Sequence, residues 1–159
     1  GSMDNWIVRK FGGASVADAG CFRRVADIVE ASPNPREAVV LSACRGVTDA
    51  LLGLVTLAEK PHGDFIPAIE PLKSRHLELA PALVSPAACA VFRDQLEHDC
   101  RDSAGILQAV RLIRSSTYAM RDVDSGYGEL WSPRLVGAFL RGRARIQGEG
   151  LRPPARSVV

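Results

Sequence analysis

Two short apolar runs near the start of the chain predict neighbouring strands. The first spans residues 6–11 and stops at the glycine pair Gly12 and Gly13, as a buried strand does where it ends in a tight loop. The second, residues 38–43, is continuous and rich in β-branched side chains, which is typical of a central parallel strand covered on both faces. We therefore expect both runs to end at the carboxyl edge of one parallel sheet.

The residues between these runs have the spacing of an amphipathic helix. Ser15 or Asp18 can cap its start, and the helix should end near Ser32 because two prolines follow. Its apolar positions are Phe22, Val25, Ala26, Ile28 and Val29. A strand, a helix and a second strand within about 35 residues imply a right-handed βαβ crossover.

Helical spacing dominates the middle of the chain. It predicts one helix over residues 47–59, begun by Thr48 and Asp49. Residues 66–114 predict several helices and no convincing strand. The breaks between these helices are expected at Pro71, Pro81, Pro86 and the 103–105 region.

The last part of the chain predicts a long helix and the start of another strand. The helix is expected over residues 125–143, even with Pro133 inside it. Residues 147–159 are expected to form a loop that leads into a third strand. The whole pattern predicts an α/β fold with a partial parallel sheet, rich in helix, whose exposed sheet edge would favour a homodimer.

The composition is that of a folded globular domain. Gly1 and Ser2 precede Met3 and are typical of a remnant left by cleavage of an expression tag, so we assign the domain to residues 3–159. Hydrophobic residues make up 47% of the 159 residues and charged residues 24%, which does not favour disorder. A net charge of +2 with scattered arginines predicts no nucleic-acid partner. The apolar runs are too short to span a membrane and no signal peptide precedes them, so we expect a cytoplasmic protein.

The cysteines and histidines do not form a metal-binding pattern. The four cysteines contain no C-x-x-C pair, and the three histidines are not placed as a zinc set. We therefore expect no protein metal site and interpret the cysteines as small buried hydrophobes. They are Cys21, Cys44, Cys89 and Cys100.

The first glycine loop has the composition of a phosphate-binding loop. Gly12 and Gly13 allow backbone N–H groups to approach a phosphate, and the helix that follows presents its positive N-terminal end. Lys10 adds a full positive charge beside them, which can stabilise a transferring phosphoryl group. The spacing is not that of a Walker A loop, and an ordinary strand-to-helix turn with a solvated lysine is the alternative for this loop alone.

Two further segments offer groups that suit a small amino acid. The hydroxyls of Ser42 and Thr48, with backbone N–H groups around Ala43 and Gly46, can hold a carboxylate. Glu129 can give an ammonium group a charge-assisted hydrogen bond and reject dicarboxylates that lack the amine. A turn with a helix cap, and a glutamate placed by the helix dipole, are the alternatives for each segment alone.

These three segments together resemble aspartate kinases, within the amino-acid kinase family. Residues 10–16 resemble the signature K-F-G-G-x-S-V, and residues 40–49 resemble V-V-S-A-x-x-G-V-T-N. Residues 125–132 are similar to S-x-G-E-x-x-S, and all three occur in the family's order. The resemblance implies a three-layer αβα fold of the amino-acid-kinase, or carbamate-kinase-like, type.

The resemblance also implies an activity and the residues that carry it. It predicts phosphorylation of the L-aspartate side-chain carboxylate by ATP with Mg²⁺, the first step toward lysine, threonine and methionine. The residues expected to bind the ATP phosphates are Lys10, Phe11, Gly12 and Gly13, with Lys10 as the catalytic cation. The residues expected to bind aspartate are Ser42, Ala43, Thr48 and Glu129.

The chain departs from the family in two places. Ala14 stands where the family usually has threonine, and residues 154–156 read Pro-Ala-Arg where relatives have Asp-x-Arg. The resemblance identifies residues 3–159 as the N-terminal portion of the catalytic domain, without the nucleotide-binding half or the ACT domains. We therefore expect little kinase activity from these residues alone.

Three alternatives stay open at this point. The parent can be a fusion with homoserine dehydrogenase or diaminopimelate decarboxylase. The chain can also belong to a kinase for acetylglutamate or glutamate. Finally, it can be a degenerate kinase half that serves as a binding or assembly module.

Overall fold

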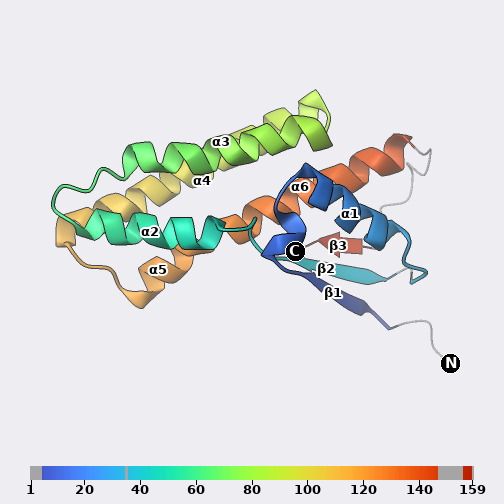
Figure 1. Ribbon diagram of the computed structural model, residues 1–159, viewed down its shortest axis with the longest axis horizontal. Helices are drawn as coiled ribbons and strands as arrows, with labels where there is room; N and C mark the ends of the chain where they lie inside the picture. The colour runs from blue at the N-terminus through green and yellow to red at the C-terminus, as the bar shows by residue number, and fades with distance from the viewer. Residues whose placement is uncertain (1–4, 35, 147–155, 159) are drawn as a thin grey trace.

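A small parallel sheet lies at one end of a long helical body in the computed structural model, which describes residues 5–34, 36–146 and 156–158 (Figure 1). The sheet has three strands in the order β1-β2-β3, and both pairs are parallel. They are β1 (Ile7–Phe11), β2 (Glu37–Leu41) and β3 (Arg156–Val158). The partial parallel sheet and the third strand are thus confirmed, while the loop predicted over residues 147–155 lies outside the described residues.

The connection from β1 to β2 follows the predicted pattern. A 3₁₀ turn, η1 (Gly13–Val16), leads into α1 (Ala19–Glu30). Asp18 caps α1, because its carboxylate accepts a hydrogen bond of 2.8 Å from the amide of Cys21. The buried face of α1 is formed by Phe22, Val25, Ala26 and Val29, at helical spacing.

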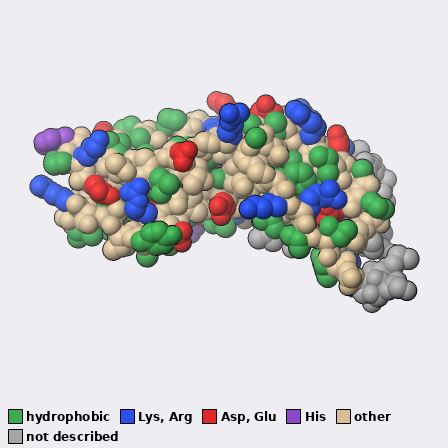
Figure 2. Space-filling view, turned by 60° about the horizontal axis from the view of Figure 1, so that its bottom comes forward, with side chains coloured by type: hydrophobic (Ala, Val, Ile, Leu, Met, Phe, Trp, Pro, Cys, Tyr) green, Lys and Arg blue, Asp and Glu red, His purple; other side chains and the backbone are tan. Residues whose placement is uncertain are grey.

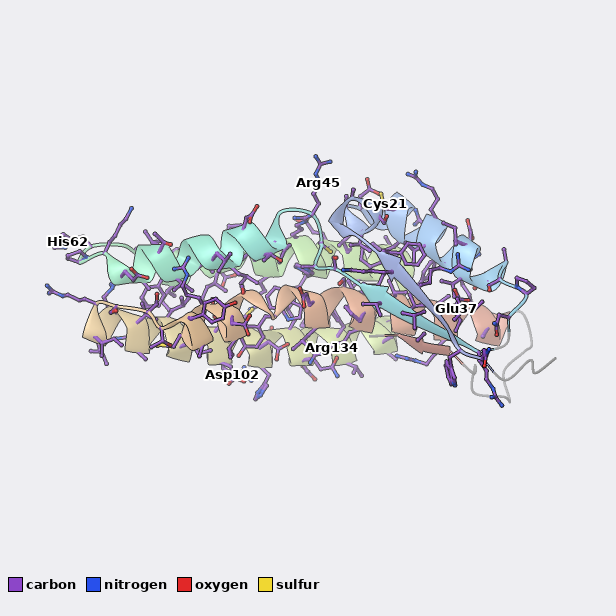
Figure 3. All side chains as sticks on the ribbon, turned by 90° about the horizontal axis from the view of Figure 1, so that it is seen from below. Cys21, Glu37, Arg45, His62, Asp102 and Arg134 are labelled. Carbon is purple, nitrogen blue, oxygen red and sulfur yellow. The ribbon has the colours of Figure 1, made fainter. Side chains whose placement is uncertain are left out.

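The helices cover one face of the sheet. Figure 1 shows α1 and α6 above the strands, and Figure 3, seen from below, shows β1 and β2 in front of α6. Val39 and Leu41 are buried on the covered face, whereas Val8 on the other face is 68% exposed. Cover on both faces is therefore not met in the described part of the chain, where the second face of β2 is only half-buried.

Four helices form the body beyond the sheet. In it α3 packs on α4, and α2 packs on both α4 and α5 (Figure 1). The four helices are α2 (Val47–Glu59), α3 (Ile66–Leu83), α4 (Pro86–Ile113) and α5 (Tyr118–Ser125).

Most of the predicted breaks between residues 66 and 114 are wrong. Pro71 and Pro81 lie inside α3, and the 103–105 region lies inside α4. Only Pro86 marks a helix start, where the hydroxyl of Ser85 caps α4. The long apolar face that α3 and α4 bury against each other outweighs the roughly 3 kcal/mol that an interior proline costs.

The long helix predicted over residues 125–143 is confirmed with slightly later bounds, and a short helix that the sequence did not predict, α5, precedes it. The short α5 is capped by Thr117 and ends at Gly126, whose amide donates to the carbonyl of Asp122. After this turn α6 (Gly128–Ile146) begins, with Pro133 inside it as expected. The sequence did not predict α5 because this helix is polar and short, so its apolar periodicity is weak.

One hydrophobic core joins the sheet to the helical body. It runs from Val16 and Val39 through Leu51 and Leu96 to Trp131. Cys44 and Cys100 are buried in it as expected, while Cys21 and Cys89 are half-buried. Across the described ranges, no helix is both long and apolar enough to cross a membrane.

Candidate functional site

The loops that follow β1 and β2 lie side by side at the carboxyl ends of these strands. The amide of Ser42 donates a hydrogen bond of 3.0 Å to the carbonyl of Phe11, so the two strand ends are in register. Lys10 is the last residue but one of β1, and its side chain is exposed. It makes no ion pair with any residue that the structure describes, so its charge is free for a ligand.

The glycine pair brings the first loop close to the second. A Cβ atom on Gly13 would lie 3.4 Å from the carbonyl oxygen of Ala43, which is van der Waals contact with the second loop. Around Gly12 there is open space, with nothing within 4 Å of a Cβ position. This open side of Gly12, next to Lys10, is where the backbone is accessible to a phosphate.

The second loop turns sharply before α2. Gly46 has a φ of 81°, a left-handed conformation that favours glycine, and it occupies the N-cap position of α2. Neither Thr48 nor Asp49 caps the helix, which corrects that expectation; both lie in its first turn instead. The side chain of Thr48 is half-buried in this first turn. In the loop before it, burial raises the pKa of the Cys44 thiol to about 11, so this thiol is neutral at pH 7.

The start of α6 packs directly on the second loop. A Cβ atom on Gly128 would lie 2.7 Å from the Cβ of Ala43 and 2.8 Å from a methyl group of Val47. Four residues later, the hydroxyl of Ser132 donates a hydrogen bond of 2.6 Å to the carbonyl of Ser42. Glu129 follows Gly128 in the first turn of α6, so it is held beside this loop.

Glu129 is available to a ligand. Its side chain is exposed and makes no ion pair within the described ranges. A carboxylate in this position, next to a loop that offers hydroxyl and backbone groups, can bind an ammonium group while the loop holds a carboxylate. The structure thus brings the three segments that contain the predicted site residues to the carboxyl ends of β1 and β2.

A buried cluster of polar side chains connects α6 to α3 and α4. One carboxylate oxygen of Asp99 in α4 accepts from the indole of Trp131 at 3.0 Å and from the guanidinium of Arg134 at 2.6 Å. The ring of His76 in α3 meets Trp131 edge-on, with 4.8 Å between the ring centroids. Burial lowers the pKa of His76, so this imidazole is neutral at pH 7.

A second buried carboxylate lies between α4 and α5. Asp124 is fully buried, and one of its oxygens accepts a hydrogen bond of 2.6 Å from the hydroxyl of Ser103. Its other oxygen has no hydrogen-bond partner among the described residues. Burial raises the pKa of Asp124 to about 6, with the Ser103 hydrogen bond opposing this shift.

Two residues that shape the site were missed in the sequence. Ser132 is part of the third segment but was given no role there. Arg75 belongs to no motif, yet its guanidinium reaches both loops, at the carbonyls of Arg45 and Ala17. The repeated serine of the third segment was a usable sign of Ser132, whereas nothing in the sequence singles out Arg75.

No group of three or more His, Cys, Asp or Glu side chains among the described residues could hold a metal ion. A shallow groove between α3 and α4, which contains Lys73 and Glu97, shares no residue with the site. Figure 2 shows basic and acidic side chains interspersed over the face that it presents.

The sequence of this chain is similar to a known protein family and to several of its members. The family model described as amino acid kinase family matches residues 5–140. A maize protein, bifunctional aspartokinase/homoserine dehydrogenase 1, chloroplastic, is 32% identical over 133 residues, which cover 84% of this chain and 14% of the relative. Lysine-sensitive aspartokinase 3 of Escherichia coli is 33% identical over 141 residues, which cover 89% of this chain and 30% of the relative.

Solved structures of an aspartokinase are also similar to this chain. The crystal structure of Escherichia coli aspartokinase III with aspartate and ADP superposes with a TM-score of 0.69 at 34% identity, and covers 87% of this chain and 29% of that one. The structure of the same enzyme with lysine and aspartate gives a TM-score of 0.72 at 32% identity. The chain thus has the fold of these kinases and spans 14–30% of the length of these two curated relatives.

Proposed function

Because this chain belongs to the amino acid kinase family, we propose that its parent protein is an aspartate kinase and that these residues hold the aspartate subsite and part of the phosphate subsite. The observation that carries the proposal is the packing of α6 on the second loop. Gly128 against Ala43, and Ser132 on the Ser42 carbonyl, place Glu129 beside the loop that would hold the substrate carboxylate.

The proposed reaction transfers the γ-phosphoryl group of ATP. An oxygen of the aspartate side-chain carboxylate attacks the γ-phosphorus, the bond from that phosphorus to the bridging oxygen breaks, and ADP leaves. The product is 4-phospho-L-aspartate. Catalysis of this kind depends on positioning and on charge stabilisation rather than on a covalent intermediate.

Each site residue has a defined part in this proposal. Lys10 offsets negative charge on the phosphoryl oxygens, and the backbone of Phe11, Gly12 and Gly13 lines the phosphates. Glu129 binds the substrate ammonium group, while Ser42, Ala43 and Thr48 bind its carboxylates. Mg²⁺ bound with ATP would supply further positive charge at the transferring phosphoryl group.

The whole protein's setting is also a proposal. We expect residues 3–159 to bind ligands with little turnover of their own, and expect an exposed sheet edge to favour a homodimer. A cytoplasmic location stays a prediction, since the plant relatives are named as chloroplastic.

A titration of this chain with L-aspartate and with succinate tests the proposal, with affinity measured by calorimetry. Succinate has both carboxylates but no amine, so Glu129 should favour aspartate over succinate by about tenfold or more, the value of one charge-assisted hydrogen bond. Glu129→Gln keeps the shape and loses the charge, so the variant should lose this preference. The control is Glu78→Gln, an exposed helical glutamate in α3.

Two results would count against the proposal. Equal preference for aspartate in the wild type and in Glu129→Gln would remove Glu129 from the subsite. Tighter binding of glutamate or N-acetylglutamate than of aspartate would make the parent a kinase for that acid instead.

A further inference from the structure

Arg75 connects two loops that are far apart in the sequence. It lies in α3 and is half-buried. One nitrogen of its guanidinium group donates a hydrogen bond of 2.5 Å to the carbonyl of Arg45, and the other donates one of 3.3 Å to the carbonyl of Ala17. The Arg45 side chain itself points away from the body (Figure 3), so only its backbone takes part in this contact.

The two carbonyls belong to the loops of the candidate site. Ala17 follows η1 and precedes Asp18, the cap of α1. Arg45 precedes Gly46, the left-handed residue that begins α2. These loops already touch where Gly13 approaches the Ala43 carbonyl, so Arg75 supplies a second point of attachment.

Two fixed attachment points determine the orientation of a loop as well as its distance. In a trans peptide unit the C=O bond and the next N–H bond point in opposite directions. With the carbonyls of Ala17 and Arg45 turned toward Arg75, the amides of Asp18 and Gly46 point away from α3. A guanidinium group is suited to this task because its donors are held in a rigid plane.

We propose that Arg75 is a positioning residue. It couples the loop of residues 12–18 to the loop of residues 42–47, so that aspartate and ATP both bind to the same relative arrangement of these loops. This inference rests on the proposed function for the identity of the ligands. The coupling itself concerns the chain without ligand, and it can be measured there.

Hydrogen exchange of the unliganded chain tests the coupling. In Arg75→Ala, amides of residues 12–18 and of residues 42–47 should both exchange faster, while those of α4 should not change. The matched control is Arg23→Ala, because Arg23 in α1 also donates a hydrogen bond of 3.1 Å to a backbone carbonyl, that of Ala82, which belongs to neither loop. Faster exchange in only one loop of Arg75→Ala, or in neither, would overturn the proposal.

Affinities measured well below the melting temperature test the consequence for binding. Arg75→Ala should weaken both L-aspartate and Mg-ATP by about tenfold or more, whereas Glu129→Gln should weaken aspartate alone. Arg75→Lys keeps the positive charge but lacks the planar guanidinium group, so both affinities should stay below those of the wild type. Wild-type affinity in Arg75→Lys, or a lower melting temperature in Arg75→Ala with both affinities unchanged, would overturn the proposal.

Failure of the proposed function has a different signature. If the wild-type chain binds neither ligand, the kinase site is wrong, and the shared arrangement for two ligands fails with it. Unchanged affinities in Arg75→Ala, beside a wild type that binds both ligands, would remove only the role of Arg75.

Discussion

At the residue scale, Gly128 determines how closely α6 approaches the second loop. The space for its side chain is already filled by Ala43 and by a methyl group of Val47. Close contact of this kind needs a residue without a Cβ atom, because the neighbours are part of the core and cannot move freely. The position of Glu129 therefore depends on the absence of a side chain at the residue before it.

Substitution of Gly128 should separate α6 from the loop. We expect Gly128→Ala to lower the free energy of unfolding by about 1–3 kcal/mol, the usual cost of overpacking, and to weaken aspartate binding. Gly53→Ala is the control, because Gly53 lies inside α2 with nothing within 4 Å of a Cβ position. That change should raise stability by about 0.5–1 kcal/mol. Urea denaturation of both variants measures the difference, and equal effects would contradict the packing described here.

Sequence patterns suggested candidate residues for the site but not the contacts that hold their segments in place. Lys10, Gly12 and Glu129 stand in segments whose residue types suggest their chemistry. Ser132 and Arg75 act on backbone carbonyls, and a carbonyl is present at every position, so no partner residue marks these contacts in the sequence. Only the folded chain shows which carbonyls they reach.

At the scale of elements, a buried pair of polar side chains joins α4 to α5. Asp124 and Ser103 are both buried, and their hydrogen bond leaves one carboxylate oxygen without a partner among the described residues. A carboxylate of this kind is more stable in its neutral form, which explains the raised pKa. The contact between these helices therefore changes its charge in a mildly acidic range.

The stability of the chain should reflect this titration. The folded pKa of Asp124, about 6, lies above the value of 3.8 for a free aspartate, so the folded state binds more protons between these pH values. Its contribution to the free energy of unfolding must then fall as pH rises through this range. Asp124→Asn cannot ionise, so it should gain about 2 kcal/mol relative to wild type between pH 4 and pH 7.

Chemical denaturation at a series of pH values measures this gain. Asp122→Asn, at an exposed aspartate of the same helix, is the matched control. A constant difference between Asp124→Asn and wild type across the range would show that Asp124 does not titrate as described.

The errors in the predicted helices arise because a local sequence pattern contains no information on tertiary contacts. Pro71 and Pro81 are helix breakers in isolation, yet α3 continues through both because its other residues pack against α4. The short helix α5 was not predicted because Asp124 is its one buried residue, so its sequence has little apolar pattern. Tertiary contacts, which a local pattern does not contain, decided each case.

At the scale of the whole molecule, the sheet and the helical body share one core. The buried cluster extends from Val39 in β2 to Leu107 in α4 without a division. Along it, α6 contacts β2 and β3 as well as α3 and α4. The two ends of the elongated molecule in Figure 1 should therefore unfold together.

Two optical probes test this cooperativity. Trp131 is 1% exposed and reports on the core, while Trp6 is 54% exposed and can be replaced by phenylalanine to remove its signal. In Trp6→Phe, unfolding by urea followed by Trp131 fluorescence and by far-ultraviolet circular dichroism should give coincident transitions. Two separate midpoints would mean that the sheet and the helical body are independent units.

Pro133 removes one backbone hydrogen bond from the first turn of α6. A helical amide at this position would donate to the carbonyl of Glu129, four residues earlier, and proline has none. The turn that contains Glu129 is held in place instead by Gly128 against Ala43 and by Ser132 on the Ser42 carbonyl. Movement of the second loop should therefore carry the Glu129 carboxylate with it, so that the two parts of the proposed aspartate subsite move together.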